Sequence, residues 1–177
     1  MKSYDYAHRK GIEELSWDDI GELSRELAEK LSEWDIDKVI GIARAGLFPA
    51  TAVAAMLRVE LLPVRITRRV GDVVRYKHPV WRVDLPDLVS GLSLAVIDEI
   101  ADTGQTLSLV AARALERGAR QVRTASLFAH SWADPMPDLT VRVSDALVIF
   151  PWDKQVLSNG KWITHPEIEA AIRAQGT

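Results

Sequence analysis

Residues 92–106, which read LSLAVIDEIADTGQT, decide the fold that we predict for this chain. The first six residues are apolar apart from one serine, as is typical of a buried β-strand. Two acids and a Thr-Gly turn follow, and the sequence from Gln105 or Thr106 to Arg117 then has the pattern of a helix that stops at Gly118. The stretch therefore predicts a strand, a tight polar loop and a helix.

The segments before this stretch also alternate between helix and strand. Residues 16–19 form a capping box, and apolar residues then recur at helical spacing up to Trp34, which predicts a helix of about four turns. Residues 38–43 are an apolar run too short for a helix, and residues 49–57 after them have a helical pattern. A strand, a tight loop and a helix are therefore expected here too.

A second strand is expected at residues 61–66. Pro63 cannot donate a hydrogen bond to a neighbouring strand, so we expect this strand at a sheet edge, or Pro63 at the start of the strand. Residues 67–80 show no clear periodicity, which indicates a long loop.

The remaining segments complete an α/β pattern. Residues 122–129 and 146–150 read as strands, and residues 166–174 read as a short helix capped by Thr164 or His165. Strands that alternate with helices favour a doubly wound, mostly parallel sheet with helices on both faces. A chain of 177 residues without a linker or an internal repeat is expected to form a single domain over residues 1–177.

Composition narrows the class of protein. Hydrophobic residues make up 47% and charged residues 27% of the chain, which is typical of a globular protein. There are no cysteines, so disulfides, thiolate metal sites and a cysteine nucleophile are excluded. Residues 1–6 lack the apolar core of a signal peptide, and no apolar run reaches membrane-span length, so we expect a cytoplasmic protein without a membrane partner. A net charge of −3 makes nucleic acid an unexpected partner.

The loop after the central strand suits a sugar phosphate. Free backbone N–H groups at a helix start attract phosphate, and Gly104 allows close approach of the backbone. Asp98 and Glu99 would repel phosphate, so their expected role is to accept hydrogen bonds from sugar hydroxyls or to hold hydrated magnesium. On physical grounds alone, these residues could equally be ordinary helix-capping residues.

The same residues carry a resemblance to a known family. Apolar residues followed by two acids, two small or apolar residues and Asp-Thr-Gly-x-Thr resemble the phosphoribosyl diphosphate (PRPP) signature of type I phosphoribosyltransferases, closest to the xanthine-guanine and archaeal-type purine enzymes. The resemblance implies that the terminal segments form a small hood over the sheet. It also implies PRPP binding by the following residues: Asp98, Glu99, Ala101, Asp102, Thr103, Gly104, Gln105 and Thr106.

Residues 41–50 resemble the pyrophosphate loop of that family. The resemblance implies that Arg44, Ala45 and Gly46 contact PRPP, and that the Ala43-Arg44 peptide bond is cis. Ala45 departs from the glycine that is usual in the family, and its methyl group would limit the approach of the diphosphate to the backbone. The alternative is a simple strand-to-helix turn with a surface arginine.

Residues 67–80 lie where the family has a flexible loop that closes over the active site. The resemblance makes Arg75, Tyr76 and Lys77 candidates to reach the diphosphate. The alternative for each is a place in a solvated, charged hairpin.

The base pocket departs most from the family pattern. The resemblance implies base contacts from His130, Leu147 and Val148, but His130 replaces a lysine and Leu147 replaces an aromatic residue. The alternative for His130 is a buried, hydrogen-bonded histidine. Asp153 matches an acid that helps to bind magnesium, so the metal ligands implied are Asp98, Glu99 and Asp153, whereas Trp152 is expected in the core.

The resemblance implies an enzyme that transfers ribose 5-phosphate from PRPP to a nitrogenous base of purine salvage, such as xanthine, guanine or hypoxanthine, and releases pyrophosphate. Asp102 is the expected general base, Mg2+ the expected cofactor, and a homodimer or homotetramer the expected assembly. The alternative is a PRPP-binding regulator of nucleotide-synthesis genes with little or no catalysis. A kinase is disfavoured because the chain lacks a phosphate-binding loop with Gly-Lys-Ser/Thr.

Overall fold

A six-stranded sheet lies at the centre of the structure, a computed structural model that describes residues 9–70 and 73–175. Its strands, in spatial order, are β6 (Val80–Val83), β3 (Glu60–Thr67), β2 (Lys38–Ile42), β7 (Ser93–Ala101), β8 (Gln121–Ala129) and β9 (Leu139–Val143). Neighbouring strands are parallel except for β6, which is antiparallel to β3. The predicted mostly parallel sheet is confirmed.

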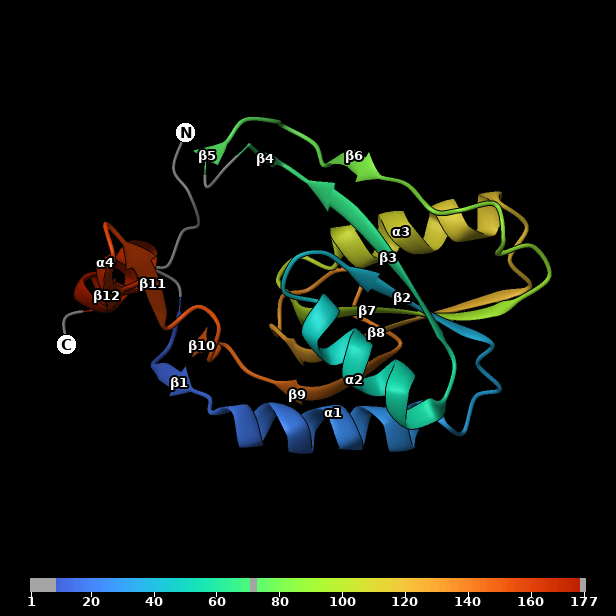
Figure 1. Ribbon diagram of the computed structural model, residues 1–177, viewed down its shortest axis with the longest axis horizontal. Coiled ribbons are helices and arrows are strands. Elements are labelled where there is room, and N and C mark those ends of the chain that lie inside the picture. The colour runs from blue at the N-terminus through green and yellow to red at the C-terminus, as the bar shows by residue number, and fades with distance from the viewer. Residues whose placement is uncertain (1–8, 71–72, 176–177) are drawn as a thin grey trace.

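Helices cover both faces of this sheet (Figure 1). α1 (Trp17–Leu31) and α2 (Leu47–Leu57) pack on one face, and α3 (Gln105–Glu116) packs on the other. Two consecutive residues of β7 show the consequence, because Ile97 belongs to the core under α1 and α2 while Val96 belongs to the core under α3. A strand buried on both faces needs a continuous apolar run, and this explains the sequence of residues 92–97.

α1 begins as its sequence predicts. The Asp19 N–H donates to the Ser16 hydroxyl at 3.1 Å, and the Ser16 N–H donates to the Asp19 carboxylate at 2.7 Å, which completes the capping box. These bonds lower the pKa of Asp19. The helix ends at Leu31, so the prediction that Trp34 lies on it is wrong; Trp34 instead packs against the core from the following turn.

Two predictions for residues 61–80 need correction. β3 is not an edge strand, because β6 pairs with its last residues, Arg65–Thr67; at Pro63 only β2 is paired, so the missing N–H costs no bond on the other side. The expected long loop contains a short antiparallel pair, β4 (Arg69–Val70) and β5 (Val73–Val74).

Segments near the two ends of the described chain form a small subdomain, which we call the hood. β1 (Ile12–Glu14) pairs with β10 (Leu147–Ile149). β11 (Gln155–Ser158) and β12 (Lys161–Thr164) form a hairpin, and α4 (Pro166–Ala174) follows. Figure 1 shows the hood facing the ends of the parallel strands. The predicted hood and the predicted C-terminal helix are confirmed.

The hood also corrects details of the prediction. The strand expected at residues 146–150 lies in the hood rather than in the central sheet, where β9 takes the edge position. Of the two predicted caps of α4, Thr164 and His165, the structure has His165, whose Nδ1 accepts from the Glu167 N–H at 3.2 Å.

Within the described ranges, no helix combines the length and the apolar character that a membrane crossing requires. Residues 1–6, in which we expected no signal peptide, lie outside the described residues.

Candidate active site

Three loops meet at the carboxyl edge of the sheet. They follow β2, β7 and β8, which are adjacent parallel strands. The chain continues from β2 to β3 on one side and from β7 to β8 and β9 on the other, so the strand order reverses between β2 and β7. Such a switch point is where open α/β sheets bind ligands.

Two carboxylates stand at the end of β7. Asp98 and Glu99 still belong to the strand, and the Glu99 N–H donates to the Asp98 carboxylate at 3.0 Å. Burial raises the pKa of Asp98. The pKa of Glu99 is raised well above its usual range, by burial first and then by the neighbouring negative charge of Asp98. A cation or sugar hydroxyls at this position would compensate for the lost hydration.

Gly104 is required where the loop enters α3. Its φ of +76° lies in the left-handed region, and a Cβ there would lie 2.0 Å from the Pro135 carbonyl oxygen. The Asp134 N–H donates to the Thr103 carbonyl at 3.2 Å, which holds the two segments together. The first turn of α3 has no side-chain cap, so its N–H groups are available to an anion.

The loop after β2 is packed against the loop after β7. A Cβ at Gly46 would lie 2.6 Å from both the Asp98 carboxylate and the Ile42 carbonyl, so this position excludes any larger residue. Ala45 is partly exposed, and the Ala43-Arg44 peptide bond is cis, as the resemblance implied. Arg44 is exposed. Gly46 is therefore the glycine that allows the loop after β2 to contact the loop after β7.

Asp153 reaches the same edge from the hood. Burial raises the pKa of Asp153, while the positive charges of His165 and Arg44 lower it. The Asp153 charge in turn contributes to the raised pKa of Glu99, so these carboxylates lie within electrostatic reach of each other. In the described part of the chain, no three His, Cys, Asp or Glu side chains are grouped closely enough to hold a metal ion.

Trp152, which was expected in the core, is partly buried in an aromatic stack. Its ring lies 4.3 Å from that of Phe48 and 4.8 Å from that of Phe150, with nearly parallel planes. Phe150 also meets Phe128 edge to face at 5.9 Å. The stack joins the segment that follows β10 to α2 and to the sheet core.

His130 follows β8 and is a buried, hydrogen-bonded residue. Only 2% of its surface is exposed, and its backbone N–H donates to the Ala101 carbonyl at 3.1 Å. Nδ1 lies 2.6 Å from the Ser144 carbonyl, which can only accept, so Nδ1 carries the hydrogen. Burial, followed by the nearby Arg9 charge, lowers the pKa of His130. The imidazole is therefore neutral near pH 7.

Asp102 is joined to two residues that the sequence did not single out. Its Oδ1 accepts from Arg9 Nη2 at 3.2 Å and from Trp132 Nε1 at 3.3 Å. The Trp132 ring stacks on His130 at 4.5 Å, and the Arg9 guanidinium carbon lies 4.9 Å from the Trp132 ring centre. The expected general base and the expected base-pocket histidine thus belong to one cluster.

The other two expected base-pocket residues lie on β10. Leu147 is buried, and its side chain packs with Ile149 and with Ile168 of α4 in the core of the hood. Val148 is partly buried and packs against the core beneath α1 and α2. One face of β10 therefore packs inside the hood, and the other packs against the core of the sheet.

Two of the three residues expected in the flexible loop, Arg75 and Tyr76, form hydrogen bonds in the structure. The N–H groups of Arg75 and Tyr76 both donate to the Arg68 carbonyl, at 2.8 and 3.0 Å. The Tyr76 hydroxyl accepts from Arg82 Nη2 at 2.7 Å. The side chains of Arg75 and Lys77 are exposed.

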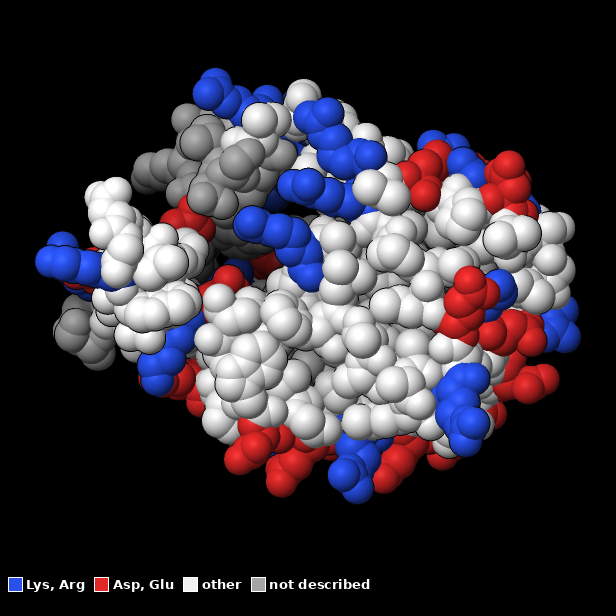
Figure 2. Space-filling model, viewed as in Figure 1, with Lys and Arg blue, Asp and Glu red and all other residues white. Residues whose placement is uncertain are grey.

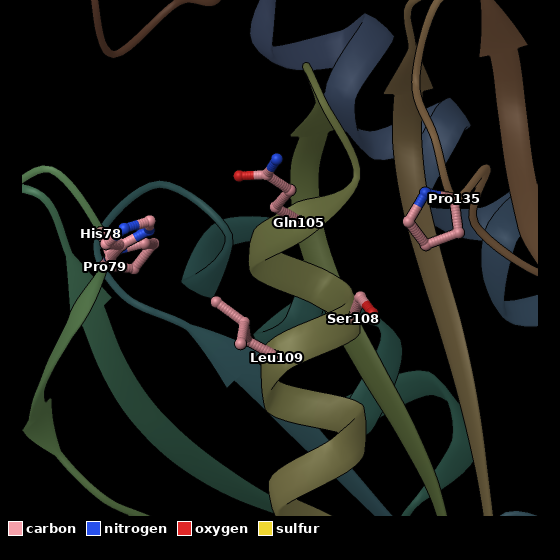
Figure 3. A pocket seen from close by; sticks show the side chains of 6 residues that line it. All are labelled: His78, Pro79, Gln105, Ser108, Leu109 and Pro135. Atoms are coloured by element: carbon pink, nitrogen blue, oxygen red, sulfur yellow. The ribbon is translucent and has the colours of Figure 1, made fainter.

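A hollow of about 470 Å³ lies beside the first turns of α3 (Figure 3). It lies between the first turns of α3 and residues 78–79. Its lining residues are His78, Pro79, Gln105, Ser108, Leu109 and Pro135. Figure 2 shows Lys and Arg side chains along the upper left of the molecule, beside a separate hollow between the hood and the sheet.

The fold and the three loops define a class of protein: an α/β protein whose switch point presents an uncapped helix start, a basic loop and partly buried carboxylates to a ligand. Comparison with known proteins identifies the family. The family described as phosphoribosyl transferase domain matches residues 10–159. This chain belongs to the phosphoribosyltransferase family, as its sequence predicted.

Individual relatives agree with this assignment. A xanthine-guanine phosphoribosyltransferase from Cereibacter sphaeroides is 31% identical over 163 residues, which cover 82% of this chain and 89% of that protein. The solved structure of a purine phosphoribosyltransferase from Pyrococcus horikoshii has a TM-score of 0.72 and 28% identity, covering 80% of this chain and 93% of that one.

A third similarity extends over the hood. A hypothetical protein from Neisseria gonorrhoeae, solved with bound ppGpp, has a TM-score of 0.67 at 21% identity and covers 96% of this chain and 98% of that one. At this identity the similarity concerns the fold alone.

Proposed function

We propose that this phosphoribosyltransferase moves ribose 5-phosphate from PRPP to a purine base such as xanthine, guanine or hypoxanthine, and releases pyrophosphate. The observation that carries the proposal is the pairing of the loops after β2 and β7 at the switch point, where Gly46 packs directly on Asp98. One loop offers N–H groups to the ribose phosphate, and the other brings a cation beside it.

Each part of PRPP has a candidate partner in this arrangement. The first turn of α3, with Thr103, Gly104 and Thr106, would bind the 5-phosphate through N–H and hydroxyl donors. The carboxylates of Asp98 and Glu99 would accept hydrogen bonds from the ribose hydroxyls. Arg44 and the backbone around Ala45 would bind the diphosphate.

The carboxylate set also fits magnesium. Asp98, Glu99 and Asp153 offer carboxylate oxygens as ligands, and burial raises the pKa of each. Mg2+ commonly keeps several waters and shares its binding with substrate phosphates. Bound magnesium would neutralise charge on the departing diphosphate. A site completed by PRPP requires no cage of three protein ligands.

Asp102 is the group that we assign as general base. As the nitrogen of the purine bonds to the anomeric carbon, the base loses a proton, which Asp102 would accept. In the described chain Asp102 Oδ1 has two donors, and no hydrogen bond reaches Oδ2, so one oxygen is available to the base. The names of the relatives, xanthine-guanine and purine phosphoribosyltransferase, support a purine acceptor.

The proposal is tested by pyrophosphate release from PRPP and magnesium with a panel of purines and pyrimidines. We expect turnover with at least one of xanthine, guanine and hypoxanthine, and none with pyrimidines. Turnover with pyrimidines alone would contradict the acceptor. PRPP binding without turnover on any base would instead support a regulator.

We further propose that the chain assembles as a homodimer or larger homo-oligomer through α2. This helix contains no charged residue, and its outward stripe includes Phe48 and Met56, which are 42% and 47% exposed. Trp17 of α1 is 56% exposed and meets Phe48 edge to face at 5.5 Å, which extends the apolar surface. Figure 2 shows this face with few charges. A second copy of the same surface would bury it.

A further inference from the structure

The side chain of Arg9 is buried with part of its hydrogen-bonding capacity unused. Only 7% of the side chain is exposed, and Nη2 donates to Asp102. The other terminal nitrogen, Nη1, is buried and has no acceptor among the described residues. Buried polar groups in native proteins almost always have a partner, and a guanidinium donor without one is costly. An orphan of this kind points to an acceptor that a ligand supplies.

The location of Arg9 restricts what this ligand is. Its guanidinium bonds the carboxylate that we assign as general base and lies over the ring of Trp132. A group that meets both Arg9 and Asp102 is therefore the acceptor base itself. His130 cannot take over this recognition through Nδ1, which is committed to the Ser144 carbonyl.

We propose that Arg9 is the residue that selects the acceptor base, and that it selects purines with an oxygen at position 6; this inference rests on the proposed function. The Arg9–Asp102 pair presents a donor, Nη1, beside an acceptor, the Asp102 carboxylate. A 6-oxopurine with its hydrogen on N7 presents the complementary edge, with O6 as acceptor beside N7–H as donor. A guanidinium has only donors, so it repels the amino group of adenine at the same position.

The reaction step balances with these groups. The N9 lone pair forms the bond to the anomeric carbon, and the bond from that carbon to the diphosphate oxygen breaks with its electron pair leaving on the diphosphate. The N7 proton passes to Asp102. Arg9 donates a hydrogen bond to O6 throughout and transfers no proton, because a guanidinium stays charged in proteins. Its effect is therefore on which base is used.

The test compares bases that differ only at position 6. Arg9→Met keeps an unbranched side chain against Trp132 and removes all donors. We expect it to lower kcat/KM for hypoxanthine by about 10- to 100-fold, the range for losing a hydrogen bond from a buried charged group. Turnover of unsubstituted purine, which has no O6, should fall by about tenfold less than turnover of hypoxanthine, because purine is affected only through the lost hydrogen bond from Arg9 to Asp102. Arg9→Lys keeps the charge without the fork and should recover only part of the loss.

The matched control is Lys10→Met, which makes the same change at the next residue, an exposed one. It should leave both rates unchanged, and PRPP affinity should be equal in all variants. Equal losses on hypoxanthine and purine, or no loss on either, in an Arg9 variant with normal PRPP affinity would overturn the role of Arg9 alone. A wild-type enzyme that uses no purine would overturn the proposed function, and the inference with it.

Discussion

At the scale of single residues, the proposed role of Asp102 as general base predicts the effect of one substitution that preserves the shape of the side chain. Asp102→Asn keeps the shape and the bonds from Arg9 and Trp132 but cannot accept a proton. We expect kcat to fall by about 10²- to 10⁴-fold, the usual contribution of a positioned base, while PRPP affinity is unchanged. Steady-state kinetics with hypoxanthine and calorimetric PRPP titration measure the two quantities.

A neighbouring carboxylate provides the control for this prediction. Asp134 is exposed, so Asp134→Asn should turn over at the wild-type rate. If Asp102→Asn also kept the wild-type rate, the carboxylate would be only part of the helix entry, and the general base would have to be sought elsewhere.

His130 gives the fold a pH dependence of predictable sign. Its pKa is lowered below the ordinary value of 6.5 in the folded protein, mainly by burial. As the pH falls below 6.5, the unfolded chain takes up a proton that the folded chain refuses, so stability decreases until the folded pKa is reached. One such group contributes a slope of at most about 1.4 kcal/mol per pH unit.

The slope is measured by denaturant unfolding between pH 7 and pH 5, relative to His130→Asn. The asparagine amide can donate to the Ser144 carbonyl in place of Nδ1 but does not titrate. The variant is expected to be less stable at pH 7, because it leaves a cavity, and to lose less stability on acidification. Parallel curves for the two proteins would show that His130 does not titrate differently in the folded state.

At the scale of elements, the turn between β7 and α3 depends on Gly104 in two ways. Alanine there would have a left-handed φ and would meet the Pro135 carbonyl. Gly91 has the same φ of +76° with nothing within 4 Å of its Cβ position, so Gly91→Ala isolates the cost of the conformation. That cost is about 1 kcal/mol, and Gly104→Ala should exceed it by about 1–3 kcal/mol, the usual cost of overpacking.

Thermal unfolding and PRPP binding separate these two contributions. Gly91→Ala is expected to bind PRPP normally, since this residue precedes β7 at the opposite end of the strand from the site. Gly104→Ala should also bind PRPP more weakly, because the start of α3 must move away from Pro135. Equal stability losses in the two variants would show that Pro135 yields without cost.

The elements differ in how far their sequence predicts them. Residues 92–106 were predictable because a strand covered on both faces needs a continuous apolar run. The hairpin of β11 and β12 has a local sequence pattern, because Asn159 and Gly160, with φ of 49° and 75°, form a typical hairpin turn. β1 has only three residues and is defined by its partner β10. Such long-range pairing leaves no local pattern.

The residues of the site likewise divide into those in local sequence motifs and those brought together only by folding. Arg44, Gly46 and the acids of β7 lie in contiguous motifs, so their neighbourhood could be expected from the sequence. Arg9 could not, because it meets Asp102 across 93 residues of chain and stands in a polar segment without periodicity. Only the folded structure shows that its side chain is buried.

At the scale of the whole molecule, the apolar outward face of α2 predicts self-association. Ala55→Glu places a charge on this stripe without disturbing the aromatic stack of Phe48 and Trp152. We expect the wild type to sediment as a dimer or larger species and Ala55→Glu to shift toward monomer by at least about tenfold in dissociation constant, because a charge in an apolar interface is left unpaired.

Arg25→Glu is the matched control, because it introduces the same residue at an exposed position of α1, whose outer surface is already charged. It should sediment as the wild type does. Analytical ultracentrifugation over a range of protein concentrations distinguishes the two variants, and circular dichroism verifies that both are folded. A wild-type monomer at all concentrations would leave the α2 face uncovered in solution, whereas an Ala55→Glu oligomer as tight as the wild type would place the interface on another surface of the molecule.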